Sequence, residues 1–218
     1  MALFATSLGE DGAQLRPLEP WNARELLEHI ERGRAYVGRY TPLAATVNDL
    51  ASSRAFLARF ADRTRDDRAR IAGIWLNDRL VGGVVLRAMN LQEGFAEAGC
   101  WLEPEVVGRG LVTRAAGVLI DWAVQERGIH RIEWWVRSDN TESLAVARRL
   151  GMRRDGVLRE RIVKDGRRHD VEIWSVLAPE WRARGGAPDT GADADPDTDP
   201  DVRAGPEPDP RSGPQVPQ

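Results

Sequence analysis

The segment Val106-Val107-Gly108-Arg109-Gly110-Leu111-Val112-Thr113 places two glycines around an arginine, where an apolar run gives way to a helical pattern. Glycine permits left-handed backbone angles and lets backbone amides approach another molecule closely. The N-terminus of a helix also presents unpaired N–H groups that favour an anion. The segment therefore predicts a phosphate-binding loop at the start of a helix.

Hydrophobic periodicity on both sides of this loop predicts a mixed α+β domain. Upstream, the pattern predicts a strand at 14–18, a helix containing Leu26, Leu27 and Ile30, a helix opened by a capping box of Thr46 and Asp49, a hairpin of strands 70–76 and 80–88 around Asn77-Asp78-Arg79, and an antiparallel strand at 95–102. Downstream, it predicts a long helix with Leu111, Ala115, Val118, Leu119 and Trp122 on one face and ended by Gly128, a strand at 130–137, a helix at 143–150 stopped by Gly151, and a hairpin of 152–160 with 168–177 around Asp165-Gly166. The long helix is then a β-α-β crossover, which makes strands 95–102 and 130–137 candidates for parallel neighbours with the loop at the carboxyl edge of the sheet.

Composition indicates one domain with an appendage. The chain has 218 residues, of which 42% are apolar and 30% charged, as in soluble globular proteins. We expect a flexible N-terminus at 1–12, a folded domain at 13–182 and a disordered tail at 183–218, where eight acidic residues, three arginines and eight prolines leave little apolar surface to bury. This tail is either a solvating segment or an acidic arm that docks or regulates. No run approaches the ~18 apolar residues of a membrane span, and the start lacks signal-peptide features, so we expect a cytoplasmic protein with no membrane partner.

Several classes of site are disfavoured by residue type. Cys100 is the single cysteine and the three histidines are scattered, so neither a disulfide nor a metal is expected. The folded part carries only a small positive charge without a basic stripe, which disfavours direct nucleic-acid binding. A dinucleotide fingerprint would need a third glycine where Thr113 stands, and a P-loop would need Gly-Lys-Ser/Thr, which is absent. A simple tight turn remains as the alternative explanation of the glycines.

The arrangement of several motifs resembles the GNAT superfamily of acyl-CoA-dependent N-acyltransferases. The family's phosphate motif (Gln or Arg, two residues, Gly, any residue, Gly or Ala) falls on Glu105-Val106-Val107-Gly108-Arg109-Gly110. Over about residues 13–181 the chain is similar to the RimJ/RimL branch, which acetylates the N-termini of ribosomal proteins. The similarity rests on Ala96-Glu97-Ala98-Gly99-Cys100-Trp101-Leu102, Asn140-Thr141-Glu142-Ser143, Leu150-Gly151-Met152, Asp155-Gly156-Val157-Leu158-Arg159, and Asp165-Gly166 followed by Asp170.

This resemblance implies a fold, a co-substrate and a binding site. The fold is a mixed, mostly antiparallel sheet with a central parallel β-α-β crossover, at which strands 95–102 and 130–137 splay apart. The co-substrate is acetyl-CoA, whose pyrophosphate would meet the backbone amides of 107–113 and the charges of Arg109 and Arg114. Its pantetheine arm would pair like a strand with 100–102, and Asn140 would orient the arm. The expected cofactor-binding residues are Cys100, Trp101, Leu102, Val107, Gly108, Arg109, Gly110, Leu111, Val112, Thr113, Arg114, Asn140 and Ser143.

Two residues are expected to act in catalysis. An amine that attacks a thioester must lose a proton, and the departing thiolate must gain one. An α-amine with a pKa near 8 is already about 10% neutral at pH 7, so an N-terminal substrate needs only a modest base. Glu97 is the expected base, acting through water, although a structural ion pair explains it equally well. Ser143 matches the proposed proton donor of the RimL branch, and a helix-capping serine is its alternative.

Other residues depart from the branch pattern or have more ordinary explanations. Glu105 occupies the Gln/Arg position of the motif, so we expect its side chain to point away from phosphate. Cys100 stands where the branch commonly has tyrosine, and we expect it to be a small buried residue rather than a nucleophile. Ile162 replaces a glutamate of the closing hairpin, for which Glu160 is a candidate substitute. The region with Tyr36, Tyr40 and Pro42, which shapes the acceptor site in this family, lacks the branch's tryptophans.

The sequence thus predicts an acetyl-CoA-dependent N-acetyltransferase acting on a primary amine, foremost the N-terminal α-amine of a protein such as a ribosomal protein. A small-molecule amine acetyltransferase, acting on an antibiotic, a polyamine or an amino acid, is one alternative. A non-catalytic acyl-CoA-binding module is the other. The acyl length, the acceptor and the choice between monomer and homodimer stay open.

Overall fold

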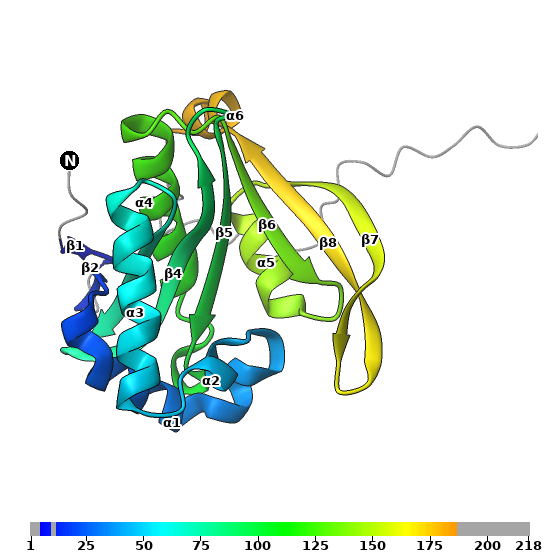
Figure 1. Ribbon diagram of the computed structural model, residues 1–218. Coiled ribbons are helices and arrows are strands. Elements are labelled where there is room, and N and C mark those ends of the chain that lie inside the picture. Colours follow the sequence, from blue (N-terminus) through cyan, green and yellow to red (C-terminus); the bar gives the residue numbers. More distant parts are fainter. Residues whose placement is uncertain (1–4, 10–11, 187–218) are drawn as a thin grey trace, which may run out of the picture.

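The computed structural model describes residues 5–9 and 12–186 (Figure 1). Its strands are β1 (Thr6–Ser7), β2 (Ala13–Pro17), β3 (Arg70–Leu76), β4 (Arg79–Asn90), β5 (Phe95–Leu102), β6 (Arg131–Arg137), β7 (Arg153–Lys164) and β8 (Arg167–Leu177). Its helices are α1 (Ala23–Tyr40), α2 (Leu43–Thr46), α3 (Leu50–Arg65), α4 (Leu111–Glu126), α5 (Thr141–Arg149) and α6 (Ala178–Ala183), with the single 3-10 turns η1 (Pro20–Asn22) and η2 (Pro104–Val106).

The described strands form one eight-stranded sheet in the order β1-β2-β3-β4-β5-β6-β8-β7. Neighbouring strands are antiparallel except β5 and β6, which are parallel and joined through α4. This is the expected β-α-β crossover within a mostly antiparallel sheet. The crossover brings the glycine loop to the carboxyl end of β5.

Strands β5 and β6 are paired over only part of their length. Their register runs from Phe95↔Arg131 to Ala98↔Trp134 and then stops. Beyond that point β6 continues to pair with β8 as far as Arg137, while residues 99–102 of β5 pair only with β4. In Figure 1 the two ribbons start side by side and diverge, with α1 and α2 near the open end. The expected splay is therefore present.

Helices cover both faces of the sheet. One apolar cluster joins the sheet to α4, α5 and α6 and contains the fully buried Trp134 and Trp181. A second cluster joins the other face to α1 and α3 and includes Leu26, Leu57 and Trp101. Figure 1 shows α3 in front of the sheet and α4 behind it. The sheet thus lies between two hydrophobic layers.

The turns of both hairpins follow directly from their residues. Asn77 and Asp78 have φ values of 50° and 60°, and Asp165 and Gly166 have φ values of 50° and 72°. Two successive positive φ angles define the type I′ turn that suits the twist of a two-residue hairpin, and Asn, Asp and Gly tolerate it best. Strand β4 accordingly starts at Arg79, one residue earlier than expected, and extends to Asn90.

Three boundaries differ from the expectation. The stretch 1–12, expected to be flexible, contains β1, which pairs with β2 and is followed by the buried Leu8. Helix α3 is capped by Asp49, whose carboxylate accepts from the Ser52 N–H at 2.7 Å, because Thr46 is taken up as the last residue of α2. Helix α5 begins at Thr141, two residues before the expected start, because Asn140 caps it.

Two further expectations concern the C-terminal tail and membrane-spanning helices. Most of the expected tail, residues 187–218, lies outside the described residues. Within 5–9 and 12–186, no helix has both the length and the apolar composition required to cross a bilayer.

Candidate functional site

A cavity of about 1240 Å³ opens where β5 and β6 separate. It is lined by the end of β5, the glycine loop, the first turns of α4 and α5, and the end of α1. Every residue expected in the site borders it, namely Glu97, Cys100, Trp101, Leu102, Val107, Gly108, Arg109, Gly110, Leu111, Val112, Thr113, Arg114, Asn140 and Ser143. Segments separated by more than forty residues in the sequence therefore share one cavity.

The glycine loop adopts the left-handed geometry that its sequence suggested. Gly108 and Gly110 have φ values of 84° and 69°, and Gly110 is the N-cap of α4. Among the described residues, the N–H groups of Gly108, Gly110 and Leu111 form no backbone hydrogen bond. Arg114 steadies the loop by donating from Nη2 to the Arg109 carbonyl at 3.1 Å. The loop thus presents amides and positive charge to the cavity, as an anion site requires.

The exposed edge of β5 forms the second wall. Because β6 leaves after Ala98, the backbone of 99–102 has no strand partner on that side among the described residues. An amide-containing chain lying in the split could pair with this edge as an added strand does. Cys100 lies on this edge, and burial raises the pKa of its thiol to about 12. The thiol stays protonated at neutral pH, which suits a packing residue better than a nucleophile.

The start of α5 carries the polar groups on the β6 side. Asn140 Oδ1 accepts from the Ser143 N–H at 3.2 Å, so Asn140 caps the helix and Ser143 does not. The indole Nε1 of Trp134 donates to Ser143 Oγ at 2.9 Å. Since the hydroxyl oxygen already accepts this bond, its own proton remains available to donate. The geometry supports a donor role for Ser143 and disfavours the capping alternative.

Glu97 borders the cavity in an ion pair. Arg87 donates from Nε to Glu97 Oε1 at 2.8 Å and makes a second contact from Nη2. Among the described residues, no protein group donates to Glu97 Oε2, and the Glu97 side chain is 21% exposed. Glu97 can therefore still reach solvent in the cavity.

The other carboxylates considered from the sequence point elsewhere. Glu105 pairs with Arg79 at 3.3 Å and does not border the cavity, which agrees with a side chain turned away from phosphate. Glu160 does not border it either, although its neighbours Arg161 and Ile162 do. Position 160 has a φ of 51° and its N–H binds Asp170, so an irregularity in β7 takes its side chain out of the expected alternation.

The end of α1 faces the cavity from the other side. Tyr36 and Tyr40 border it, and the Tyr36 hydroxyl donates to Glu142 in the first turn of α5. Burial, reinforced by this carboxylate, raises the pKa of Tyr36 to about 12. Tyr40 donates to the Asp139 carbonyl at 3.3 Å. These contacts join α1 to α5 across the open end of the split and form the cavity wall at which the resemblance places the acceptor.

Sequence reasoning missed several residues of the cavity. Glu142 appeared only within a motif, and Trp135, Arg149, Trp181 and Arg184 were not assigned to the site, yet all border it. Trp181 and Arg184 follow the last strand, and no local sequence pattern indicates that the chain returns to the cavity at that point. The basic Arg149 ends α5, where basic residues are common for reasons of helix stability alone.

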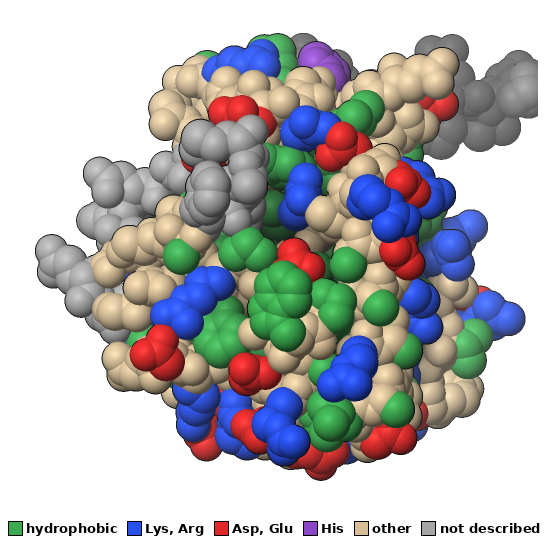
Figure 2. Space-filling model, turned by 60° about the vertical axis from the view of Figure 1, so that its left-hand side comes forward, with side chains coloured by type: hydrophobic (Ala, Val, Ile, Leu, Met, Phe, Trp, Pro, Cys, Tyr) green, Lys and Arg blue, Asp and Glu red, His purple; other side chains and the backbone are tan. Residues whose placement is uncertain are grey.

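The surface and the titratable groups add two observations. On the described part of the face shown in Figure 2, basic and acidic side chains are intermixed, and neither sign forms a continuous stripe. In the described ranges, His, Cys, Asp and Glu do not gather in groups of three that could hold a metal ion. The expectations of no metal and no nucleic-acid partner stay predictions.

Comparison with known proteins assigns the chain to a family. Residues 13–153 match the model of the acetyltransferase (GNAT) domain. The chain therefore belongs to the GNAT acetyltransferases, and its sheet with a parallel crossover is the GNAT fold.

Individual relatives agree with this assignment. The Bacillus subtilis protein named "Putative ribosomal N-acetyltransferase YdaF" is 29% identical over 168 residues, which cover 77% of this chain and 92% of the relative. A RimL ribosomal L7/L12 α-N-protein acetyltransferase solved with coenzyme A superposes with a TM-score of 0.76 at 19% identity, covering 80% of this chain and 98% of the other. The microcin C7 self-immunity acetyltransferase MccE, solved with acetyl-CoA and AMP, gives 0.71 at 25% identity, with 77% and 93% covered.

Proposed function

We propose that this acetyltransferase transfers the acetyl group of acetyl-CoA to the N-terminal α-amine of a protein, in the manner of the RimJ/RimL enzymes. The observation that carries the proposal is the combination of a split sheet and a bare helix N-terminus in one cavity. The split begins after Ala98, and the amides of Gly108 and Gly110 lie at its edge. This arrangement suits a ligand with a diphosphate at one end and an amide arm at the other.

In this proposal the donor runs along the cavity from the glycine loop to β5. The amides of 108–113 and the guanidinium groups of Arg109 and Arg114 hold the diphosphate. The Val107 N–H, also expected to bind it, instead donates to the Pro104 carbonyl at 3.3 Å. The pantetheine arm pairs with 100–102, and its thioester lies between Glu97 on β5 and Ser143 on α5. A backbone amide on this edge of β5 would stabilise the oxyanion of the tetrahedral intermediate.

The acid–base steps then fall to two side chains. The amine nitrogen attacks the thioester carbonyl carbon, and Glu97 accepts its proton through water. The C–S bond breaks as the intermediate collapses, and Ser143 Oγ gives its proton to the leaving thiolate while it takes one from water in the cavity. The bond from Trp134 to Ser143 Oγ, 2.9 Å long, supports this direction of transfer. Since an α-amine is about 10% neutral at pH 7, an ion-paired carboxylate is a sufficient base.

The protein N-terminus as acceptor is supported by relatives. YdaF, which is 29% identical to this chain, is named as a putative ribosomal N-acetyltransferase. The ribosomal-protein-serine acetyltransferase of Escherichia coli is 27% identical over 109 residues. MccE is 25% identical and was solved with the small molecule AMP beside acetyl-CoA, which favours a second candidate, a small-molecule amine acceptor with the same donor site.

One experiment separates these candidates. Calorimetry with coenzyme A tests the donor site, and thiol release from acetyl-CoA is then followed with short N-terminal peptides, amino sugars, polyamines and amino acids. We expect turnover with peptides that carry a free α-amine and none with the same peptides blocked at the N-terminus. Turnover confined to the small amines would replace the protein acceptor, and the absence of coenzyme A binding would remove the donor site.

A further inference from the structure

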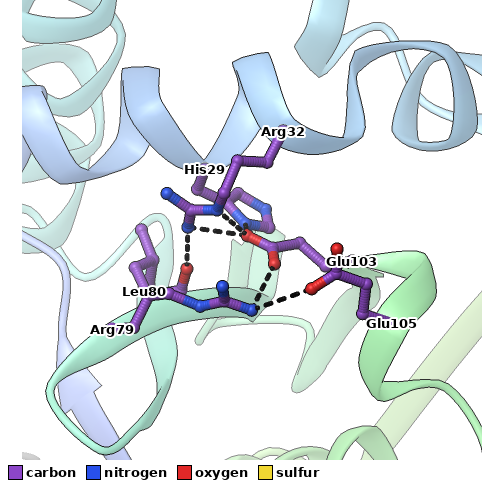
Figure 3. A network of polar contacts seen from close by, with 6 residues as sticks. All are labelled: His29, Arg32, Arg79, Leu80, Glu103 and Glu105. Atoms are coloured by element: carbon purple, nitrogen blue, oxygen red, sulfur yellow. Dashed lines mark hydrogen bonds and ion pairs between the residues drawn. The ribbon is translucent and has the colours of Figure 1, made fainter.

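A buried carboxylate lies at the origin of the glycine loop. Glu103 follows β5 directly and precedes η2, and it is only 1% exposed. Its carboxylate binds His29 Nδ1 at 2.8 Å, Arg32 Nε at 2.9 Å and Arg79 Nη2 at 3.1 Å. Figure 3 shows these groups converging from α1 and from the β3–β4 hairpin. We call Glu103 and these three partners the Glu103 cluster.

The two arginines of the cluster favour the ionised form of Glu103. Burial alone would raise the pKa of Glu103, but hydrogen bonds from His29 and Arg32 outweigh it and lower the pKa. Burial lowers the pKa of His29, against the opposing effect of Glu103. His29 Nε2 is buried and has no described partner, so the neutral tautomer with its proton on Nδ1 fits best. A charged Glu103 is therefore fixed by two arginines and a neutral histidine.

The cluster fixes the position of the glycine loop as well. The Glu103 N–H donates to the Val81 carbonyl at 2.8 Å, and Arg32 Nη2 donates to the Leu80 carbonyl at 2.7 Å. The carbonyl of Glu103 in turn accepts from the Val106 N–H at 3.3 Å. Both ends of the residue are thus held, and Gly108 follows only five residues later.

Glu103 and Pro104 also pack against the bend of α1 at Gly33. Gly33 has non-helical angles inside α1, and a Cβ added to it would lie 3.5 Å from Pro104 Cδ and 3.8 Å from Glu103 Cγ. Beyond this bend, α1 carries Tyr36 and Tyr40 into the cavity wall. The start of the loop and the bend of α1 are therefore packed against each other.

We propose that Glu103 is a positioning residue that couples the donor loop to the cavity wall formed by α1 and α5, so that occupation of the loop by coenzyme A restrains residues 34–42. This inference rests on the proposed function, because it takes the loop to be the diphosphate site. Rigid packing on both sides of Glu103 supplies the connection: the loop is anchored at Glu103, and Glu103 is bonded to the half of α1 that precedes the bend.

Hydrogen exchange with and without coenzyme A tests the coupling. In the wild type, saturating coenzyme A should slow exchange in both 107–113 and 34–42, by about threefold or more in the second segment. In Glu103→Gln the slowing at 107–113 should persist while that at 34–42 is lost. Glu105→Gln is the matched control: it removes an exposed charge that also binds Arg79 and lies two residues further along the chain, and it should behave as the wild type.

The outcomes are distinct. If coenzyme A neither binds in calorimetry nor protects 107–113, the proposed function fails and the coupling with it. If coenzyme A protects 107–113 but leaves 34–42 unchanged in the wild type, or protects 34–42 equally in Glu103→Gln, the coupling is wrong and the donor site stands. Should Glu103→Gln not fold, Arg32→Gln carries the test, since Arg32 is 33% exposed and its loss leaves His29 on Glu103.

Discussion

The indole nitrogen of Trp134 donates a hydrogen bond of 2.9 Å to the hydroxyl oxygen of Ser143. Trp134 lies on β6 at the last residue paired with β5, and Ser143 lies in the first turn of α5. The contact therefore fixes the hydroxyl at the point where the sheet opens. Because the indole only donates, it leaves the hydroxyl proton directed elsewhere.

Ser143→Ala should lower kcat by about 10²-fold, the lower range for loss of a general acid, while the Kd for coenzyme A stays within about twofold. Steady-state thiol release and calorimetry measure the two quantities. Trp134→Phe should lower kcat by a smaller factor, because it keeps an aromatic side chain but removes the indole N–H, which frees the hydroxyl to rotate. Undiminished turnover in Ser143→Ala would leave the serine with a packing role only.

Gly108→Ala should weaken coenzyme A binding by about tenfold, equivalent to ~1.4 kcal/mol. Position 108 has a φ of 84°, which costs an alanine about 1 kcal/mol and shifts the loop amides as the strain relaxes. Gly128→Ala is a matched control, because Gly128 has a φ of 67° at the other end of α4 and a Cβ meets nothing within 4 Å at either position.

Both glycine variants should lose similar stability in urea unfolding, and only Gly108→Ala should lose affinity in calorimetry. Equal affinity in the two variants would argue against a phosphate role for the loop.

Much of the fold was predictable because its signals are local. The Asp165-Gly166 turn, the helix end at Gly128 and the alternation of apolar residues each depend on a few neighbouring residues. The place of the glycine loop at the cavity was predictable for the same reason, since 107–114 is one contiguous segment. The start of α3 was less predictable. Thr46 and Asp49 are both good N-cap residues, and the packing of α2 decides between them.

The cavity wall formed by α1 and α5 could not be predicted in this way. Tyr36 and Glu142 are 106 residues apart, and only the packing of α1 against α5 brings them together. The same holds for Glu103, whose partners His29 and Arg32 lie more than seventy residues before it. A glutamate next to a proline has the appearance of an ordinary solvated loop residue, and no sequence pattern indicates its burial.

Alkylation of Cys100 should be slow and should rise with pH without levelling off below pH 10. Burial raises the pKa of this thiol to about 12, so the reactive thiolate is scarce at neutral pH and increases tenfold for each unit of pH. At pH 8 the rate in the folded protein should be on the order of 10³ below that in urea, where the pKa returns to about 8.5.

The chain has a single cysteine, so labelling with iodoacetamide followed by mass spectrometry gives a direct measurement. A rate that levels off between pH 8 and 9 would indicate an ordinary, accessible thiol instead.

Glu97→Gln should lower kcat by about 10²-fold and leave the Kd for coenzyme A nearly unchanged, since the base acts on the amine and not on the donor. Glu133→Gln provides a close comparison. Glu133 faces Glu97 in the β5–β6 register, has the same 21% exposure and is also paired with an arginine, but it does not border the cavity. Glu133 Oε2 also accepts from Trp135 Nε1 at 2.8 Å, a bond that the amide oxygen of glutamine can keep. Its substitution should therefore leave turnover within about twofold.

Unfolding in urea should show similar small losses of stability for the two glutamine variants, because each removes one partly exposed ion pair. A fall in kcat shared by both would assign Glu97 to the structural ion pair with Arg87 and leave the base to be sought among the other groups bordering the cavity. A fall confined to Glu97→Gln, largest at low pH where the neutral amine is scarce, is the result that a base acting on an α-amine requires.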